Sequence, residues 1–119
     1  MKTLYVFGNE FLDDDKLAGI VSNNLKGNFK VERCRSPDDL LDAGKEIVIL
    51  DVVKGIKEPI IIKDISKIKS RNLMSLHDFD LGFFLKLMEG MGINKKIKII
   101  GIPQKGNAKD IAKEVERWI

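Results

Sequence analysis

The sequence predicts an α/β fold, in which a mostly parallel, twisted sheet of about five strands carries helices on both faces. Short β-rich runs alternate with segments of helical periodicity, which is the pattern of such folds. The run "EIVILDVV" at 46–53 is apolar nearly throughout, as expected for a strand that is buried on both faces. Another run, "EPIIIKDI" at 58–65, contains Pro59 near its start and therefore fits an edge strand, which we expect to be antiparallel. With 119 residues, we expect a single domain over 1–119.

Three further runs complete the predicted sheet. The apolar run "TLYVF" at 3–7 ends at Gly8 and predicts a buried strand. The alternating run "FKVERC" at 29–34 predicts a second strand, and "KIKIIGIP" at 96–103 predicts the last one.

Four segments have helical character. The first has apolar residues at helical spacing and a stop at Gly27, and the second has Ser36 as N-cap, Pro37 at the first helical position and Gly44 beyond its end. The third starts near Ser75, where "SLHD" is similar to a capping box. The apolar positions that define the first, third and last helices are Leu17, Ile20, Val21 and Leu25; Leu81, Phe84, Leu85 and Met88; and Ile111, Val115 and Trp118.

The composition excludes several classes of protein. The apolar fraction of 44% argues against disorder, and no apolar run approaches the roughly 20 residues of a membrane span. The basic residues are scattered and the aromatic residues are few, so nucleic-acid binding is not expected. A single cysteine, Cys34, excludes a disulfide framework and a cysteine-based zinc site. We expect a monomeric, cytoplasmic protein.

Candidate site residues follow the predicted strands. Ligands of open α/β sheets bind at the carboxyl ends of the strands, and Asp13, Asp14 and Asp15 follow the first strand, Asp51 follows "IVIL", and His77 follows the "RNLMS" loop. Two carboxylates and one imidazole form a ligand set for a divalent transition metal, with room for an outside group. A helix N-terminus disfavours the charged imidazolium, which would keep His77 able to ligate.

Simpler roles compete with this one. A carboxylate at a helix start usually caps the helix, and we assign that role to Asp13 or Asp14. Asn9 after Gly8 suits a turn, although its side chain could also bind a substrate backbone. Cys34 fits a small buried apolar residue. Asp51 at the end of an apolar run has no comparable structural role.

Four segments resemble hydrogenase maturation endopeptidases, which trim the C-terminal extension of the nickel–iron hydrogenase large subunit. "FGNEFLDDDKLAG" resembles the family's G-N-x-L-x-x-D-D/E…G opening, and "EIVILD" with "VVKGIKEPIIIKD" resembles its third strand and the following hairpin. "SLHDFDLGFFL" resembles its S/T-x-H-x-x-x-L segment, and "IKIIGIPQ" resembles its last strand. The resemblance covers roughly residues 3–103.

The resemblance implies a three-layer α/β/α sandwich and a peptidase activity. It places Asp15, Asp51 and His77 on the family's metal-contacting positions, which makes them the candidate catalytic residues, and it places Gly8 and Asn9 in substrate binding. It also implies that these side chains recognise nickel already inserted in the large-subunit precursor. The nickel would be supplied by the substrate and not permanently bound, and another divalent metal could replace it in vitro.

No Ser-His-Asp or Cys-His arrangement is recognisable, so peptide cleavage would use water. One hypothesis is that the metal polarises the scissile carbonyl or the water, with an acid from 13–15 as base.

Two other functions stay open. A receiver-like module would bind magnesium and accept a phosphoryl group on Asp51, using Asp14 and Lys105. A non-cleaving chaperone would dock on the hydrogenase precursor without cutting it. The segment "RCRSPDD" stands where the family has a Gly-Gly-Thr-type loop, which fits a compact divergent protease, a protease for a different hydrogenase class, or a homologue that no longer cleaves.

Overall fold

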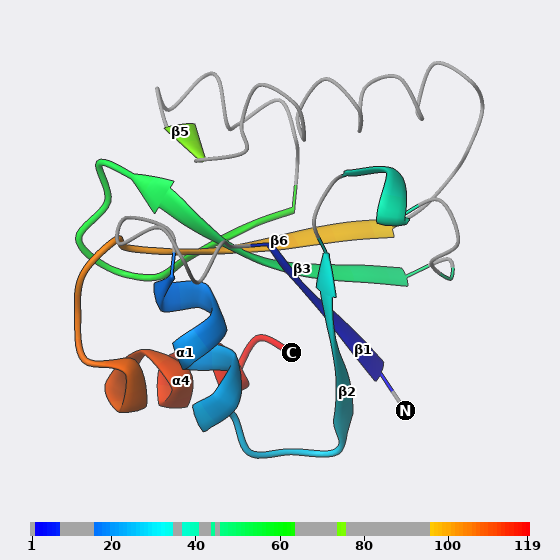
Figure 1. Ribbon diagram of the computed structural model, residues 1–119, viewed down its shortest axis with the longest axis horizontal. Coiled ribbons are helices and arrows are strands. Elements are labelled where there is room, and N and C mark those ends of the chain that lie inside the picture. The colour runs from blue at the N-terminus through cyan, green and yellow to red at the C-terminus, as the bar shows by residue number, and fades with distance from the viewer. Residues whose placement is uncertain are drawn as a thin grey trace.

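Five strands form one sheet in the order β2-β1-β3-β6-β4 (Figure 1). The structure is a computed structural model that describes residues 2–7, 16–34, 37–40, 44, 46–63, 74–75 and 96–119. The strands, in sheet order, are β2 (Phe29–Cys34), β1 (Lys2–Phe7), β3 (Glu46–Lys54), β6 (Lys96–Ile102) and β4 (Ile60–Ile62). All neighbouring pairs are parallel except β4 and β6, which are antiparallel. The predicted α/β class, with a mostly parallel sheet and one antiparallel edge strand, is confirmed.

The observed strands agree with the predicted runs to within a few residues. β2 has the predicted bounds, whereas β4 is shorter than the run at 58–65 and begins directly after Pro59. A further strand that was not predicted, β5 (Met74–Ser75), pairs antiparallel with the end of β3. Ser75, the predicted helix cap, therefore lies in an extended segment, and the helix predicted after it lies outside the described residues.

The central strand β3 is buried on both faces, as its sequence predicts. Seven consecutive residues, 47–53, are buried and only the two ends are exposed. Val48, Leu50 and Val52 enter one hydrophobic cluster, whereas Ile47 and Ile49 enter the other. Because side chains alternate between the faces of a strand, the two clusters are the cores on either side of the sheet.

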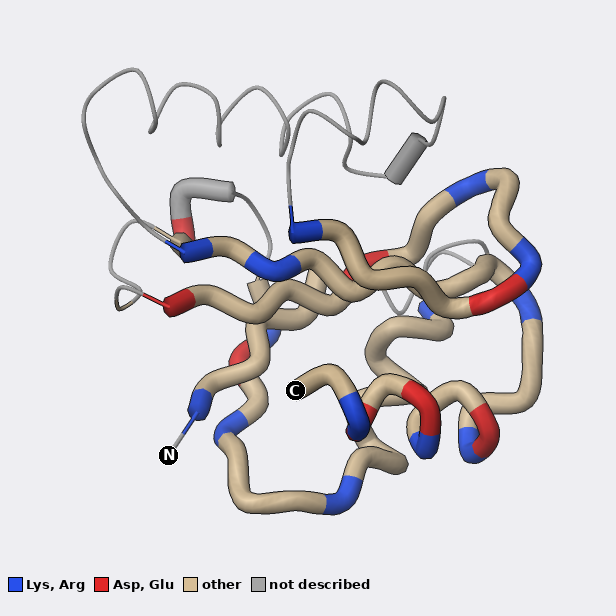
Figure 2. Tube along the Cα trace, turned by 180° about the vertical axis from the view of Figure 1, so that it is seen from behind, with Lys and Arg blue, Asp and Glu red and all other residues tan. Residues whose placement is uncertain are grey.

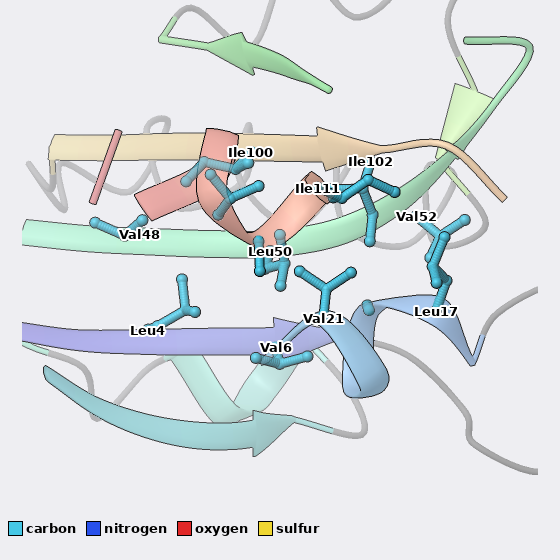
Figure 3. Close-up of a cluster of buried hydrophobic side chains, with 13 residues drawn as sticks. Leu4, Val6, Leu17, Val21, Val48, Leu50, Val52, Ile100, Ile102 and Ile111 are labelled. Carbon is cyan, nitrogen blue, oxygen red and sulfur yellow. The ribbon is translucent and has the colours of Figure 1, made fainter. Parts of the chain in front are cut away.

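Helices α1 (Leu17–Asn24) and α4 (Ala108–Glu116) cover the same face of the sheet. Figure 3 shows Val21 of α1 and Ile111 of α4 directed toward side chains of β1, β3 and β6. The apolar stripe predicted for the last helix is confirmed, since Ile111 and Val115 are buried and Trp118 packs against the same cluster.

On the opposite face, Leu40 is fully buried in the second cluster. It belongs to the short 3-10 helix η1 (Pro37–Leu40), which begins at the proline predicted for a first helical position.

The start of α1 lies at Lys16 and Leu17. The residue at its N-cap position is Lys16, whose backbone oxygen accepts the first helical hydrogen bond from Ile20 N at 3.3 Å; among the described residues, no side-chain hydrogen bond caps this helix end. Asp13 and Asp14, which were predicted to cap this helix, lie outside the described residues, so that assignment stays a prediction. Of the apolar positions predicted for this helix, Leu17 and Val21 are buried and Leu25 packs against the same cluster, whereas Ile20 is exposed.

The connection between β3 and β4 crosses the carboxyl end of β6. β6 lies between these two strands in the sheet, and Val52 pairs with Ile102 while Ile60 pairs with Gly101. The chain from Val53 to Pro59 must therefore pass over the point where β6 ends. Figures 1 and 2 both show this connection on the same side of the molecule as the loop from β6 to α4.

Among the described residues, no helix is long and apolar enough to cross a membrane.

The cap of α4 provides a test of local stability. The Asn107 side-chain oxygen accepts hydrogen bonds from Lys109 N at 3.0 Å and Asp110 N at 3.1 Å. Because Asn107→Ala removes both bonds, we expect it to lower the free energy of unfolding by about 1 kcal/mol. Urea denaturation followed by circular dichroism measures this change. Asn107→Ser, which keeps an acceptor, should retain most of the stability; equal losses in the two variants would contradict the capping role.

Candidate functional site

Of the predicted site residues, the structure describes Asp51. Asp15, His77, Gly8 and Asn9 lie outside the described residues, as do Asp13 and Asp14. The predicted convergence of Asp15, Asp51 and His77 on one metal therefore stays a prediction. Within the described residues, no group of three or more histidine, cysteine, aspartate or glutamate side chains could hold a metal ion.

Asp51 lies inside β3, three residues before its last residue, Lys54. Its ladder partner on β6 is Gly101, and the ladder to β1 stops one residue earlier, at the pair of Val6 and Leu50. Asp51 therefore occupies the level at which β1 ends while β3 continues. This level is the carboxyl edge of the sheet, where open α/β sheets bind their ligands.

The carboxylate of Asp51 is fully buried, with an exposed fraction of 0%. Its neighbours along the strand, Leu50 and Val52, are also fully buried. Transferring an ionised carboxylate into such surroundings is costly unless the charge is compensated by hydrogen bonds, an ion pair or a metal. A carboxylate is therefore not a residue that strand packing alone would select at this position.

One oxygen of the carboxylate is held by the adjacent backbone. Val52 N donates to Asp51 Oδ1 at 2.9 Å. An ionised carboxylate offers about four lone-pair sites on two oxygens, so it can accept this bond and bind a cation at the same time. The bond fixes the orientation of the group, as expected for a side chain that positions a charge.

Gly101 fits this part of the sheet because it has no side chain. A Cβ at Gly101 would lie 2.7 Å from Val53 Cγ2 and 3.2 Å from Ile60 Cγ1. The glycine thus lets two apolar side chains from β3 and β4 close over the backbone next to Asp51. This supporting residue was missed in the sequence, and the glycine within "IIGIP" was the available signal.

Cys34 also lies at this edge, because it is the last residue of β2 and pairs with Phe7, the last residue of β1. Burial raises its pKa from 9.0 to about 11, and the negative charges of Asp39 and Glu32 act in the same direction. The thiol is consequently protonated at neutral pH and is a poor nucleophile. Its packing in the second hydrophobic cluster agrees with the predicted role as a small buried apolar residue.

Comparison with solved structures places this architecture among known folds. No protein-family profile matches the chain, and no curated protein matches it significantly. The hydrogenase maturating endopeptidase HybD from E. coli is similar with a TM-score of 0.68 over 99% of this chain and 89% of that one, at 16% identity. The chain has the fold of a hydrogenase maturation endopeptidase.

Two further structures of this fold give the same result. A hydrogenase 3 maturation protease matches with a TM-score of 0.65 and 20% identity, covering 98% of this chain and 88% of that one. The endopeptidase HycI from Escherichia coli matches with a TM-score of 0.63 and 19% identity over the same shares. The fold expected from the resemblance of four short motifs is thus confirmed over nearly the whole chain.

The packing around Gly101 yields a second prediction. Gly101→Ala places a methyl group against Val53 and Ile60, so we expect the free energy of unfolding to fall by about 1–3 kcal/mol. Gly44→Ala is the matched control, because a Cβ there would meet nothing within 4 Å. Urea denaturation of both variants should leave Gly44→Ala within about 0.5 kcal/mol of the wild type. Equal stability of the two variants would show that the glycine is not needed for packing.

The thiol yields a third prediction. In the native protein, the rate of Cys34 alkylation by iodoacetamide should rise with a midpoint near pH 11, whereas in urea the midpoint should return toward 9. Because the folded pKa is raised, the stability that this group contributes is present below pH 9 and is lost as the pH rises through 11. Mass spectrometry measures the alkylation, and Cys34→Ser provides the blank. A native midpoint at 9 would contradict the burial effect.

Proposed function

We propose that this chain is an endopeptidase that removes the C-terminal extension of a nickel–iron hydrogenase large-subunit precursor after nickel insertion. The single observation that carries the proposal is the fully buried carboxylate of Asp51 at the carboxyl edge of β3. It is supported by the likeness of the whole fold to three proteins named as hydrogenase maturation proteases or endopeptidases.

In this proposal, Asp15, Asp51 and His77 together recognise the nickel of the precursor. The metal belongs to the substrate, and the three side chains test whether it has been inserted. Asp51 contributes a carboxylate oriented by Val52 N. Asp15 and His77 are assigned by the sequence motifs, and Gly8 and Asn9 are assigned to binding the substrate backbone.

Cleavage in this proposal uses water as the nucleophile. The protonated state of Cys34 supports this choice, because a thiol with a pKa near 11 is not activated at neutral pH. A carboxylate from 13–15 acts as general base toward the water, while the substrate's nickel polarises the scissile carbonyl or the water.

The burial of Asp51 adds a requirement. A fully buried carboxylate cannot contact a metal held by another protein unless docking of that protein uncovers it. The proposal therefore includes a rearrangement at the carboxyl edge when the precursor binds. We assign the protein to the cytoplasm as a monomer that meets its precursor there.

The receiver-like alternative is disfavoured by the sheet. The flavodoxin-like order 2-1-3-4-5, which receivers share, consists of parallel strands in sequence order after the switch point. Here the fourth strand in the chain is an antiparallel edge strand, and β6 lies between it and β3. Incubation with a small phosphodonor separates the two functions, since a receiver would become labelled on Asp51.

The proposal is tested with purified precursor in nickel-loaded and nickel-free forms. We expect the wild type to shorten the loaded form alone, and we expect Asp51→Asn and His77→Ala each to lower the cleavage rate by about 100-fold or more, since each removes a proposed metal contact. Gel electrophoresis and mass spectrometry of the large subunit measure the product.

Asp110→Asn is the matched control, because it makes the same chemical change on the exposed surface of α4. It should cleave at the wild-type rate. Full activity of Asp51→Asn in a folded protein would refute the site. Binding of the precursor without any cleavage by the wild type would favour the chaperone.

A further inference from the structure

Three exposed lysines lie at or beyond the carboxyl ends of β3 and β6. Lys54 is the last residue of β3, Lys57 lies in the β3–β4 connection, and Lys105 lies in the loop after β6. We call these three residues the lysine rim. At about 3.3 Å per residue along a strand, Lys54 follows Asp51 by roughly 10 Å.

The topology brings the rim residues to one side of the molecule. The β3–β4 connection crosses the carboxyl end of β6, and the loop that contains Lys105 begins at that same end. Figure 2 shows both segments at the right of the view, with lysine colouring on each. The rim thus comes from two chain segments that the sheet order forces together.

The charges of the rim are largely uncompensated. Glu58 is the one acidic residue in the described segments 54–59 and 103–106. Within the described part of the chain, none of the three rim lysines takes part in an ion pair. On β2 and α4, by contrast, charges of both signs are mixed: Lys30 pairs with Glu32 at 3.1 Å on β2, and the exposed face of α4 carries Lys109, Asp110, Lys113 and Glu114. A second group of lysines, Lys2, Lys63, Lys96 and Lys98, lies at the opposite edge of the sheet around one cavity, together with Glu46.

We propose that the lysine rim docks an acidic patch on the surface of the hydrogenase large-subunit precursor. The inference rests on the proposed function, because that function places the precursor at the carboxyl edge. Clustered charges of one sign raise the association rate of an oppositely charged protein and are most effective at low ionic strength. The rim then directs the precursor onto the edge at which Asp51 lies buried.

The test reverses the rim charges in a triple variant, Lys54→Glu, Lys57→Glu and Lys105→Glu. Its matched control reverses three exposed lysines outside the rim, Lys2→Glu, Lys63→Glu and Lys96→Glu, of which Lys2 and Lys96 begin β1 and β6 at the opposite edge. The two variants have the same net charge, so a difference between them reports position. Surface plasmon resonance with nickel-loaded precursor measures binding, and processing assays measure KM and kcat separately.

We expect the rim variant to bind about ten-fold or more weakly at low salt, with a matching rise in KM and an unchanged kcat. The dependence of binding on salt should flatten in the rim variant and persist in the control. A triple Lys→Gln variant provides the same test if the reversed charges impair folding.

The outcomes separate the two proposals. If the precursor binds through the rim but is not cut by the wild type, the docking inference stands and the peptidase proposal fails. If the rim variant binds as the wild type does, or both variants lose binding equally, the docking inference is wrong while cleavage is judged on its own. Absence of any precursor binding by the wild type also overturns the inference.

Discussion

The burial of β3 on both faces is the constraint on which the rest of the structure depends. Because seven consecutive residues of this strand are buried, other segments of the chain must cover both faces of the sheet. The amphipathic helices α1 and α4 meet this need on one face, and Leu40 contributes on the other. β1 and β6 pair with the two edges of β3. The position of β3 therefore also determines the level of the sheet at which these two neighbouring strands end.

Placing a carboxylate in such a strand makes the site and the core interdependent. Asp51 lies between Leu50 and Val52 in this strand, and the backbone N–H of Val52 orients its carboxylate. Gly101, its ladder partner, allows Val53 and Ile60 to pack closely. The carboxylate therefore lies in a strand that is buried on both faces, where its hydrogen bond to Val52 N holds it in one orientation.

Local patterns in the sequence predicted most of the fold, because apolar periodicity reports burial directly. The sequence correctly predicted a strand buried on both faces from the apolar run at 46–53 and a second strand from the alternation at 29–34. It also correctly predicted an edge strand after Pro59. The start of α1 at Lys16 was not predicted, because three aspartates and a lysine in a row give no periodic signal for the first helical residue. β5 could not be inferred, because it exists only through pairing with the distant end of β3. The glycine within the apolar run that contains Gly101 was visible, but its packing role depends on Val53 and Ile60 from other strands. Asp51 could be singled out as a candidate because a charged residue within an apolar run is visible in the sequence itself.

The insertion of β6 between β3 and β4 has a consequence for how the chain reaches its native state. β3 and β4 follow each other in the sequence, yet both pair with β6, so neither the β3–β6 ladder nor the β4–β6 ladder can form until residues 96–102 are present. The sheet therefore cannot form by successive pairing of neighbouring strands in the sequence. Its completion requires closure of the long loop between β4 and β6, which slows folding relative to local pairing. During synthesis on the ribosome, the apolar edge of β3 stays open, and this interval is when the nascent chain is most exposed to self-association.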